Sequence, residues 1–242
     1  MPASVGLRHR VVTAASWPVG VLWTSWSYIW RTTPLHRREL EGALPEDLPP
    51  ELPPGTDLSD VQQLEDGTGP LLHRRYRARL RDATVSAHEL MARLQADPDQ
   101  VAPRALAKFR KLCGPEGRME PGDEFLVHMP GPWDGPVRAV AVEPLAFRFA
   151  TLDGHLEAGQ IEWRTGEAGG RVSFQVESWA RSGDRLSAVM HDRLLMAKEV
   201  QLHMWTSVVE RVAGLSGGRL DGGIDIETRR VDGDAFNAGS RG

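Results

Sequence analysis

Alternating apolar and polar residues predict a β-sheet in the middle of the chain. In residues 71–80, Leu72, Tyr76 and Leu80 share one face of a strand, and basic residues occupy the other face. Further runs of β type end at Gly, Pro or Asp turns, and they span 124–129, 136–143, 145–152, 159–164 and 170–180. Short strands separated by such turns predict an antiparallel meander of about six strands. Trp179 is out of step with Phe174, which predicts a bulge or the end of that strand.

Apolar residues at gaps of three and four predict three helices around this sheet. Two are short and cover residues 88–97, after Ser86, and 104–112, after Pro103. The third runs from Arg185 to about Leu215, roughly 40 Å, and its apolar stripe needs the sheet as a partner. We expect Phe174, Val176, Leu194, Ala197 and Val208 to be buried.

This order of elements predicts a mixed α+β fold, in which a curved antiparallel sheet grips a long C-terminal helix. Because two short helices close only one end, we expect a tapered apolar cavity of roughly 300–1,000 Å³ between sheet and helix.

An uncharged segment precedes this body. Residues 18–31 place apolar side chains on one side at helical spacing, and Pro18 and Pro34 bound the helix. At roughly 21 Å it is too short for a hydrocarbon core of about 30 Å. We therefore expect an interfacial helix that contacts a membrane surface, the body or a second copy of the chain. Its apolar face is rich in tryptophan, with Trp17, Trp23, Trp26 and Trp30 clustered there.

Composition divides the chain into four parts. Residues 44–55 hold five prolines and predict an extended connector. The Gly-rich residues after Ser216 predict a frayed end. The expected organisation is an N-terminal helix in 1–34, a Pro-rich linker in 35–68, one domain in 69–218 and a flexible tail in 219–242.

Charge and cysteine content exclude several classes of function. The net charge is −4 and the one cysteine is Cys113, so there is neither an internal disulfide nor a Cys-based zinc cluster. A reducing, cytoplasmic location fits, with peripheral membrane contact through the tryptophan helix as a further option. The basic strand 73–79 has only Tyr76 as an aromatic, so we expect no nucleic-acid partner. Phosphate loops, serine elbows, nucleotide fingerprints and metal spacings are missing, so no cofactor or metal is expected.

Histidines and carboxylates are the candidates for chemistry. His128 could anchor a ligand if its face of the strand lines the cavity, and His155 lies in a turn between Asp153 and Glu157. Glu162 and Glu177 could form an acid–base pair, although alternation favours an exposed outer face for both. No set stands out as catalytic.

Several motifs resemble a known family. They are GPLLHRRYRARL (69–80), GDEFLVHMPGPWDGPVR (122–138), ATLDGHLEAGQIEWR (150–164), FQVESWARSGDRLS (174–187) and KEVQLHMW (198–205). Over 69–218, about three-fifths of the chain, the sequence resembles a bacterial and plant family of unknown function within the START-like helix-grip superfamily. The N-terminal segment resembles an actinobacterial extension of that family.

The resemblance implies an apolar ligand, with catalysis in some branches of the superfamily. We expect non-catalytic binding or carriage of an apolar small molecule or lipid. The alternatives are a cyclase- or hydrolase-like enzyme in the same cavity, and a membrane-surface or partner-docking module. The expected ligand-binding residues are Phe125, His128, Phe149, His155, Trp163, Met190 and Trp205.

Overall fold

A computed structural model describes residues 33–43, 45–129, 134–183 and 191–233, with the side chains of residues 168 and 191–200 left aside. The N-terminal tryptophan helix, Met190 and the expected burial of Leu194 and Ala197 lie outside this description. The helices of the described chain are η1 (Leu64–Asp66), α2 (Ala87–Ala96), η2 (Pro98–Val101) and α4 (His191–Leu215). The strands are β1 (Leu35–Glu41), β2 (Gly67–Arg81), β3 (Lys108–Cys113), β4 (Glu124–His128), β5 (Asp134–Glu143), β6 (Ala146–Thr151), β7 (Glu157–Ala168), β8 (Arg171–Gly183) and β9 (Arg219–Val231).

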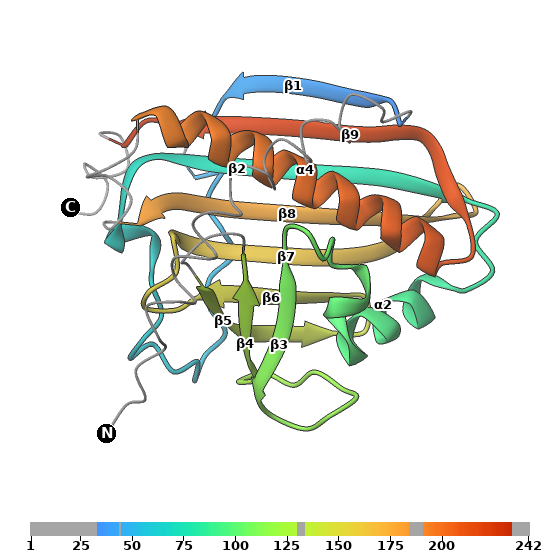
Figure 1. Cartoon of the computed structure of the whole chain (residues 1–242), viewed down its shortest axis with the longest axis horizontal. Helices are drawn as coiled ribbons and strands as arrows, with labels where there is room; N and C mark the ends of the chain where they lie inside the picture. Colours follow the sequence, from blue (N-terminus) through green and yellow to red (C-terminus); the bar gives the residue numbers. More distant parts are fainter. Residues whose placement is uncertain (1–32, 44, 130–133, 184–190, 234–242) are drawn as a thin grey trace.

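The described strands form one sheet in the order β1-β9-β2-β8-β7-β6-β5-β4-β3. All neighbouring pairs are antiparallel except β1 with β9, which is parallel. Helix α4 crosses the strands β9, β2 and β8 on one face, and α2 packs beside β7 (Figure 1). The predicted helix-grip fold is confirmed.

The core lies between this face and the helices. Strand alternation points Tyr76, Phe174 and Val176 toward α4, where Val208 and Val212 are buried against them. The short helix α2 begins at Ser86, whose hydroxyl accepts a hydrogen bond from the Glu89 N–H, as its N-cap signal predicted. The expected burial of Phe174, Val176 and Val208 is confirmed.

Three expectations about secondary structure are wrong. Residues 108–113 form the edge strand β3 rather than a helix, because Phe109 pairs with Val127 of β4 and packs on the core. Residues 219–231 form β9 rather than a flexible tail, because they fill the position between β1 and β2. Within the expected linker, residues 35–41 form β1, which pairs in parallel with β9.

The Pro-rich residues 45–66, which we call the strap, cover the face of the sheet away from α4. Leu52, Val61 and Leu64 pack on outward-facing residues of β2, β5, β6 and β8. The Gln62 N–H donates to the carbonyl of Thr151 at 2.8 Å. Both faces of the sheet are therefore buried in places, which explains why Trp179 is out of step. It lies on the outer face under the strap, in a strand whose pairing continues through it without a bulge.

Candidate functional site

Aromatic side chains fill the groove between the sheet and the C-terminal half of α4. The register of β6, β7 and β8 places Phe147 and Phe174 on either side of Trp163 on one face. The ring centroid of Trp163 lies 6.0 Å from that of Trp205 on α4, in an edge-to-face contact. Phe149 contacts Phe125, Phe147 and Phe109 at centroid distances of 5.2–6.4 Å. The sequence-predicted residues Phe125, Phe149, Trp163 and Trp205 therefore belong to one aromatic cluster.

Trp163 brings an unpartnered hydrogen-bond donor into this cluster. Its side chain is 0% exposed, and its indole Nε1 has no hydrogen-bond acceptor among the described residues. An unsatisfied buried donor costs about 1–3 kcal/mol. Such an atom in a groove is a candidate contact for the polar group of a ligand.

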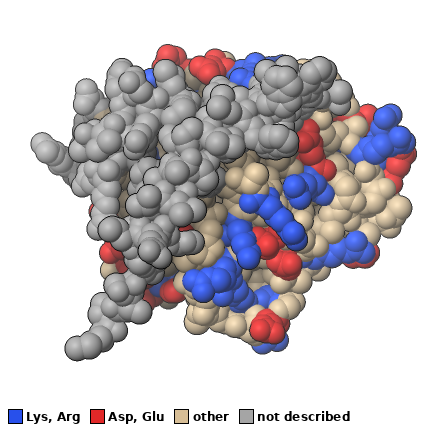
Figure 2. Space-filling model, viewed as in Figure 1, with Lys and Arg blue, Asp and Glu red and all other residues tan. Residues whose placement is uncertain are grey.

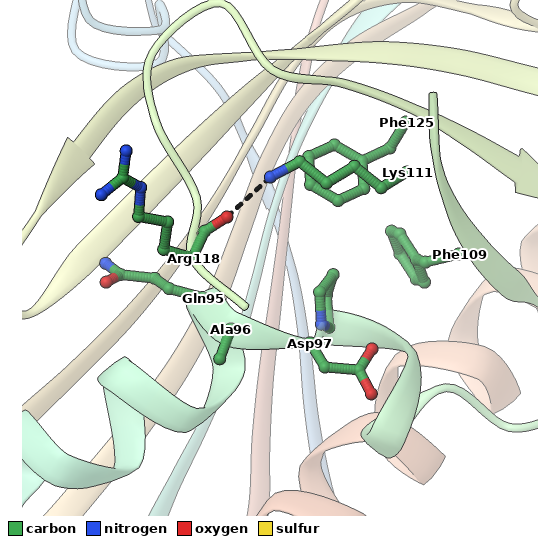
Figure 3. Close-up of a pocket in the computed structure, with 8 residues that line it drawn as sticks. Gln95, Ala96, Asp97, Phe109, Lys111, Arg118 and Phe125 are labelled. Carbon is green, nitrogen blue, oxygen red and sulfur yellow. Dashed lines mark hydrogen bonds between the residues drawn. The ribbon is translucent and has the colours of Figure 1, made fainter. Parts of the chain in front are cut away.

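A pocket opens into the cluster from the side of α2 (Figure 3). Its cavity volume is about 60 Å³, far below the predicted range. The rings of Phe109 and Phe125 line its apolar side, whereas α2 and η2 supply Gln95, Ala96, Asp97 and Pro98. Phe109 is only partly buried, and its ring contacts that of Trp163 edge-to-face at a centroid distance of 6.0 Å.

Two basic residues, Lys111 and Arg118, line this pocket, and others lie on the opposite face of β3. Figure 2 shows Lys and Arg gathered over β3, whose exposed residues include Lys108 and Arg110. Lys111, inside the pocket, forms an ion pair with Asp123 at 2.6 Å and donates to the carbonyls of Pro115 and Arg118. Arg118 pairs with Glu120 at 2.9 Å. The cations that line the pocket are therefore already neutralised.

A polar region occupies the opposite end of the groove. The guanidinium of Arg74 on β2 donates to the side-chain carbonyl of Gln201 on α4, and the Gln201 amide donates to Glu157 of β7 at 2.6 Å. Ser178 and Thr228 are the register partners of Arg74 on the two neighbouring strands, so they share its face of the sheet. The Arg74 residue is 8% exposed. Sequence analysis noted that Arg74 breaks the apolar face but assigned it no role.

Neither of the two histidines expected in the site stacks on a ring of the aromatic cluster. His128 ends β4 with a side chain that is 40% exposed, on the face opposite Phe125, and pairs with Asp134 at 2.7 Å. His155 lies in the β6–β7 turn, where its Nδ1 accepts from the Glu157 N–H at 3.0 Å. Burial lowers the pKa of His155 and favours the neutral ring. The Glu157 carboxylate binds Gln201 rather than this imidazole.

A buried ionic cluster lies on the outer face under the strap. His73 places Nδ1 2.7 Å from Asp47 of the strap and Nε2 2.7 Å from Glu177 of β8. Both ring nitrogens therefore lie within hydrogen-bonding distance of a carboxylate oxygen. Burial raises the pKa of Glu177, but the hydrogen bonds and charges of His73 and Arg75 together hold it below the ordinary value. The pKa of Asp47 is lowered in the same way, against burial, by His73, the Ala43 N–H and Arg229.

The expected acid–base carboxylates do not meet in the groove. Glu162 and Glu177 are register partners on the outer face. Glu162 pairs with Arg164 at 2.7 Å, and Glu177 binds His73 and Arg75. Among the described residues, no group of three or more His, Cys, Asp or Glu could hold a metal ion.

The sequence model of one family, described as Domain of unknown function (DUF1990), matches residues 49–210. The chain belongs to this family. The match begins within the strap, so the DUF1990 domain includes residues that cover the outer face of the sheet. No protein among those with curated descriptions matches the chain in sequence.

Solved structures resemble the DUF1990 domain only distantly. The crystal structure of Ara h 8.0201 is 13% identical, with 60% of this chain and 97% of that chain covered and a TM-score of 0.42. The major latex-like protein 151 of Panax ginseng is 11% identical, with coverage of 60% and 97% and a TM-score of 0.45. The di-domain ARO/CYC StfQ from the steffimycin biosynthetic pathway is 10% identical, with coverage of 64% and 52% and a TM-score of 0.46.

Proposed function

We propose that this DUF1990 protein binds an apolar small molecule or lipid between the sheet and α4 without chemically changing it. The observation that carries the proposal is the pocket beside α2, whose Phe109 and Phe125 walls continue into the Trp163 cluster. The unpartnered indole N–H of Trp163 supports it, because a ligand oxygen would satisfy that donor. Glu162 and Glu177 are paired with cations on the outer face, away from the aromatic cluster, and this favours binding over acid–base catalysis.

A ligand that enters the pocket beside α2 must create part of its space there. This cavity of about 60 Å³ is smaller than most ligands, and the Phe109 ring in its wall is the side chain that we expect to move. Phe109 lies on the edge strand β3, which has one neighbouring strand in the described sheet, so its displacement disturbs few other elements.

Titration with the neutral dye N-phenyl-1-naphthylamine tests this function by fluorescence. We expect saturable binding by the full-length chain, tighter binding by Phe109→Ala, which enlarges the pocket, and weaker binding by Phe109→Trp. Leu112→Ala is the matched control, because Leu112 lies exposed on the same strand. Absence of binding by all four proteins, together with native mass spectra that show no co-purified ligand, would contradict the proposal.

Peripheral membrane contact is a separate proposal for the N-terminal residues. Trp17, Trp23, Trp26 and Trp30 would lie at the headgroup level, with the flanking arginines favouring anionic lipid. Among the described helices, none has the length and apolar character needed to cross a membrane. Flotation of the full-length chain with anionic liposomes, compared with a chain that starts at Leu35, tests the contact. Equal recovery of both proteins in the soluble fraction would contradict it.

A further inference from the structure

Arg74 is a buried cation that the described protein only partly satisfies. Its guanidinium has five N–H donors, and Gln201 accepts from one of them. No carboxylate of the described residues lies within 4.0 Å of it, and its other N–H groups, which are not among the fully buried atoms, have no acceptor in the described part of the chain. A buried charge is normally paired or fully hydrogen-bonded, because its desolvation is costly.

Two of the other buried arginines, Arg138 and Arg181, are bonded into the fold, whereas Arg148 on the outer face makes one bond to the Glu51 carbonyl and leaves its Nε without a partner among the described residues. Arg138 binds Asp60 through two hydrogen bonds and Glu124 through a third, and it also donates to a strap carbonyl. Arg181 donates to the backbone carbonyls of Gly69 and Leu64. Both of these side chains hold segments of the fold together. Arg74 instead faces α4 across the groove, where its protein acceptor is one neutral amide.

The surroundings of Arg74 suit a single negative charge. Ser178 and Thr228 flank it on the same sheet face and offer hydroxyl donors. The nearby Glu157 carboxylate is separated from the guanidinium by the Gln201 amide, and it would repel a dianion at this site more strongly than a monoanion. The apolar part of the groove begins at Tyr76 and Val176, two residues further along β2 and β8.

We propose that the polar end of the groove binds the carboxylate of an amphipathic acid, with Arg74 as its bidentate partner and the hydrocarbon portion along the aromatic cluster. A planar guanidinium matches a carboxylate through two parallel hydrogen bonds. Glu157 would repel the single charge of a carboxylate less strongly than the two charges of a phosphate monoester. The inference rests on the proposed apolar-ligand function and adds the headgroup class to it.

Calorimetric titration with three ligands of equal chain length tests the assignment. Decanoate, decan-1-ol and decyl phosphate share the apolar part and differ in the headgroup. We expect decanoate to bind the full-length protein about tenfold or more tightly than decan-1-ol, as a hydrogen-bonded charge contact implies, and more tightly than decyl phosphate.

Arg74→Gln should remove the preference for decanoate and leave the affinity for decan-1-ol unchanged. Arg77→Gln is the matched control, because Arg77 lies exposed on the outer face of the same strand, bonded to Gln175. Ser178→Asp is an independent second variant: it places a carboxylate on the register partner of Arg74 and should also abolish the preference. Circular dichroism melts check that each variant is folded.

The outcomes separate the two proposals. Equal binding of decanoate and decan-1-ol by the wild-type chain, or a preference for decanoate that survives in both Arg74→Gln and Ser178→Asp, overturns the headgroup assignment and leaves the apolar-ligand function standing. Tighter binding of decyl phosphate than of decanoate also overturns it. If none of the three ligands binds, both proposals fail.

Discussion

His73 on β2 lies 2.7 Å from Asp47 of the strap, and this buried contact joins the Pro-rich segment to the sheet. Asp47 is 1% exposed and also accepts a hydrogen bond from the Ala43 N–H at 2.6 Å. The ring of His73 stacks on Trp179 at a centroid distance of 5.3 Å. Ionic, stacking and backbone contacts therefore hold the start of the strap at one point on the sheet.

Removing the Asp47 carboxylate should destabilise the domain. It would leave His73 with one carboxylate in place of two, inside a buried cluster. We expect Asp47→Ala to lower the free energy of unfolding by about 3 kcal/mol, the range for breaking a buried ion pair from one side. Urea denaturation measures the change. Asp57→Ala, an exposed position on the same strap, is the control, and equal stabilities of the two variants would contradict the role assigned to Asp47.

The same cluster predicts a loss of stability in acid. The pKa values of Asp47 and Glu177 are both held below their ordinary values in the folded protein. Their stabilising contribution is therefore complete above the unfolded-state pKa values of about 4 and is lost as the pH falls through the lower, folded-state values. The stability difference between the wild type and Asp47→Asn should shrink as the pH falls below about 4. A difference that grows in acid would contradict this prediction.

Strand β9 should be essential to the fold. It pairs with β2 and with β1, and it buries Ile224, Ile226 and Val231. We expect a chain that ends at Gly218 to aggregate or to lose its cooperative thermal transition, because the long edge of β2 becomes unpaired. A chain that ends at Gly233 keeps β9 and is the control. Normal melting of the shorter chain would restore the interpretation of residues 219–242 as a tail.

Backbone conformation explains why the sequence TLDGHLEAGQ (151–160) has glycine at position 159. The φ of Gly159 is +152°, and a Cβ there would lie 1.9 Å from the carbonyl oxygen of Trp179 on β8. Gly159→Ala should therefore cost at least about 2 kcal/mol of unfolding free energy. Gly214→Ala in α4, where a Cβ meets no atom within 4 Å, should instead stabilise the protein by about 0.5–1 kcal/mol. Thermal melts of the two variants should shift in opposite directions.

The aromatic part of the candidate site was predictable from sequence, whereas its polar end was not. Phe149 and Trp163 lie on strands with clear alternation, so their shared face followed from backbone geometry. Arg74 broke the apolar pattern of its strand, and this was the available signal for the polar end. Its partners Gln201 and Glu157 are 127 and 83 residues away in the chain, and they meet it only through tertiary packing.

The sequence by itself determined which residues form the face of the sheet toward α4, the helix α2 and the C-terminal part of α4. Apolar residues recur there at every second position in the strands and at every third or fourth position in the helices, as local backbone geometry requires. Tertiary structure decided what covers the outer face. The strap buries Trp179 and His73 there, so residues whose alternation indicated solvent exposure lie in a second core. It also decided that residues 108–113 and 219–231 are strands, because a short amphipathic segment adopts the hydrogen-bonding pattern of the sheet edge it meets. Those edges, at β4 and β2, exist only once the rest of the chain has folded.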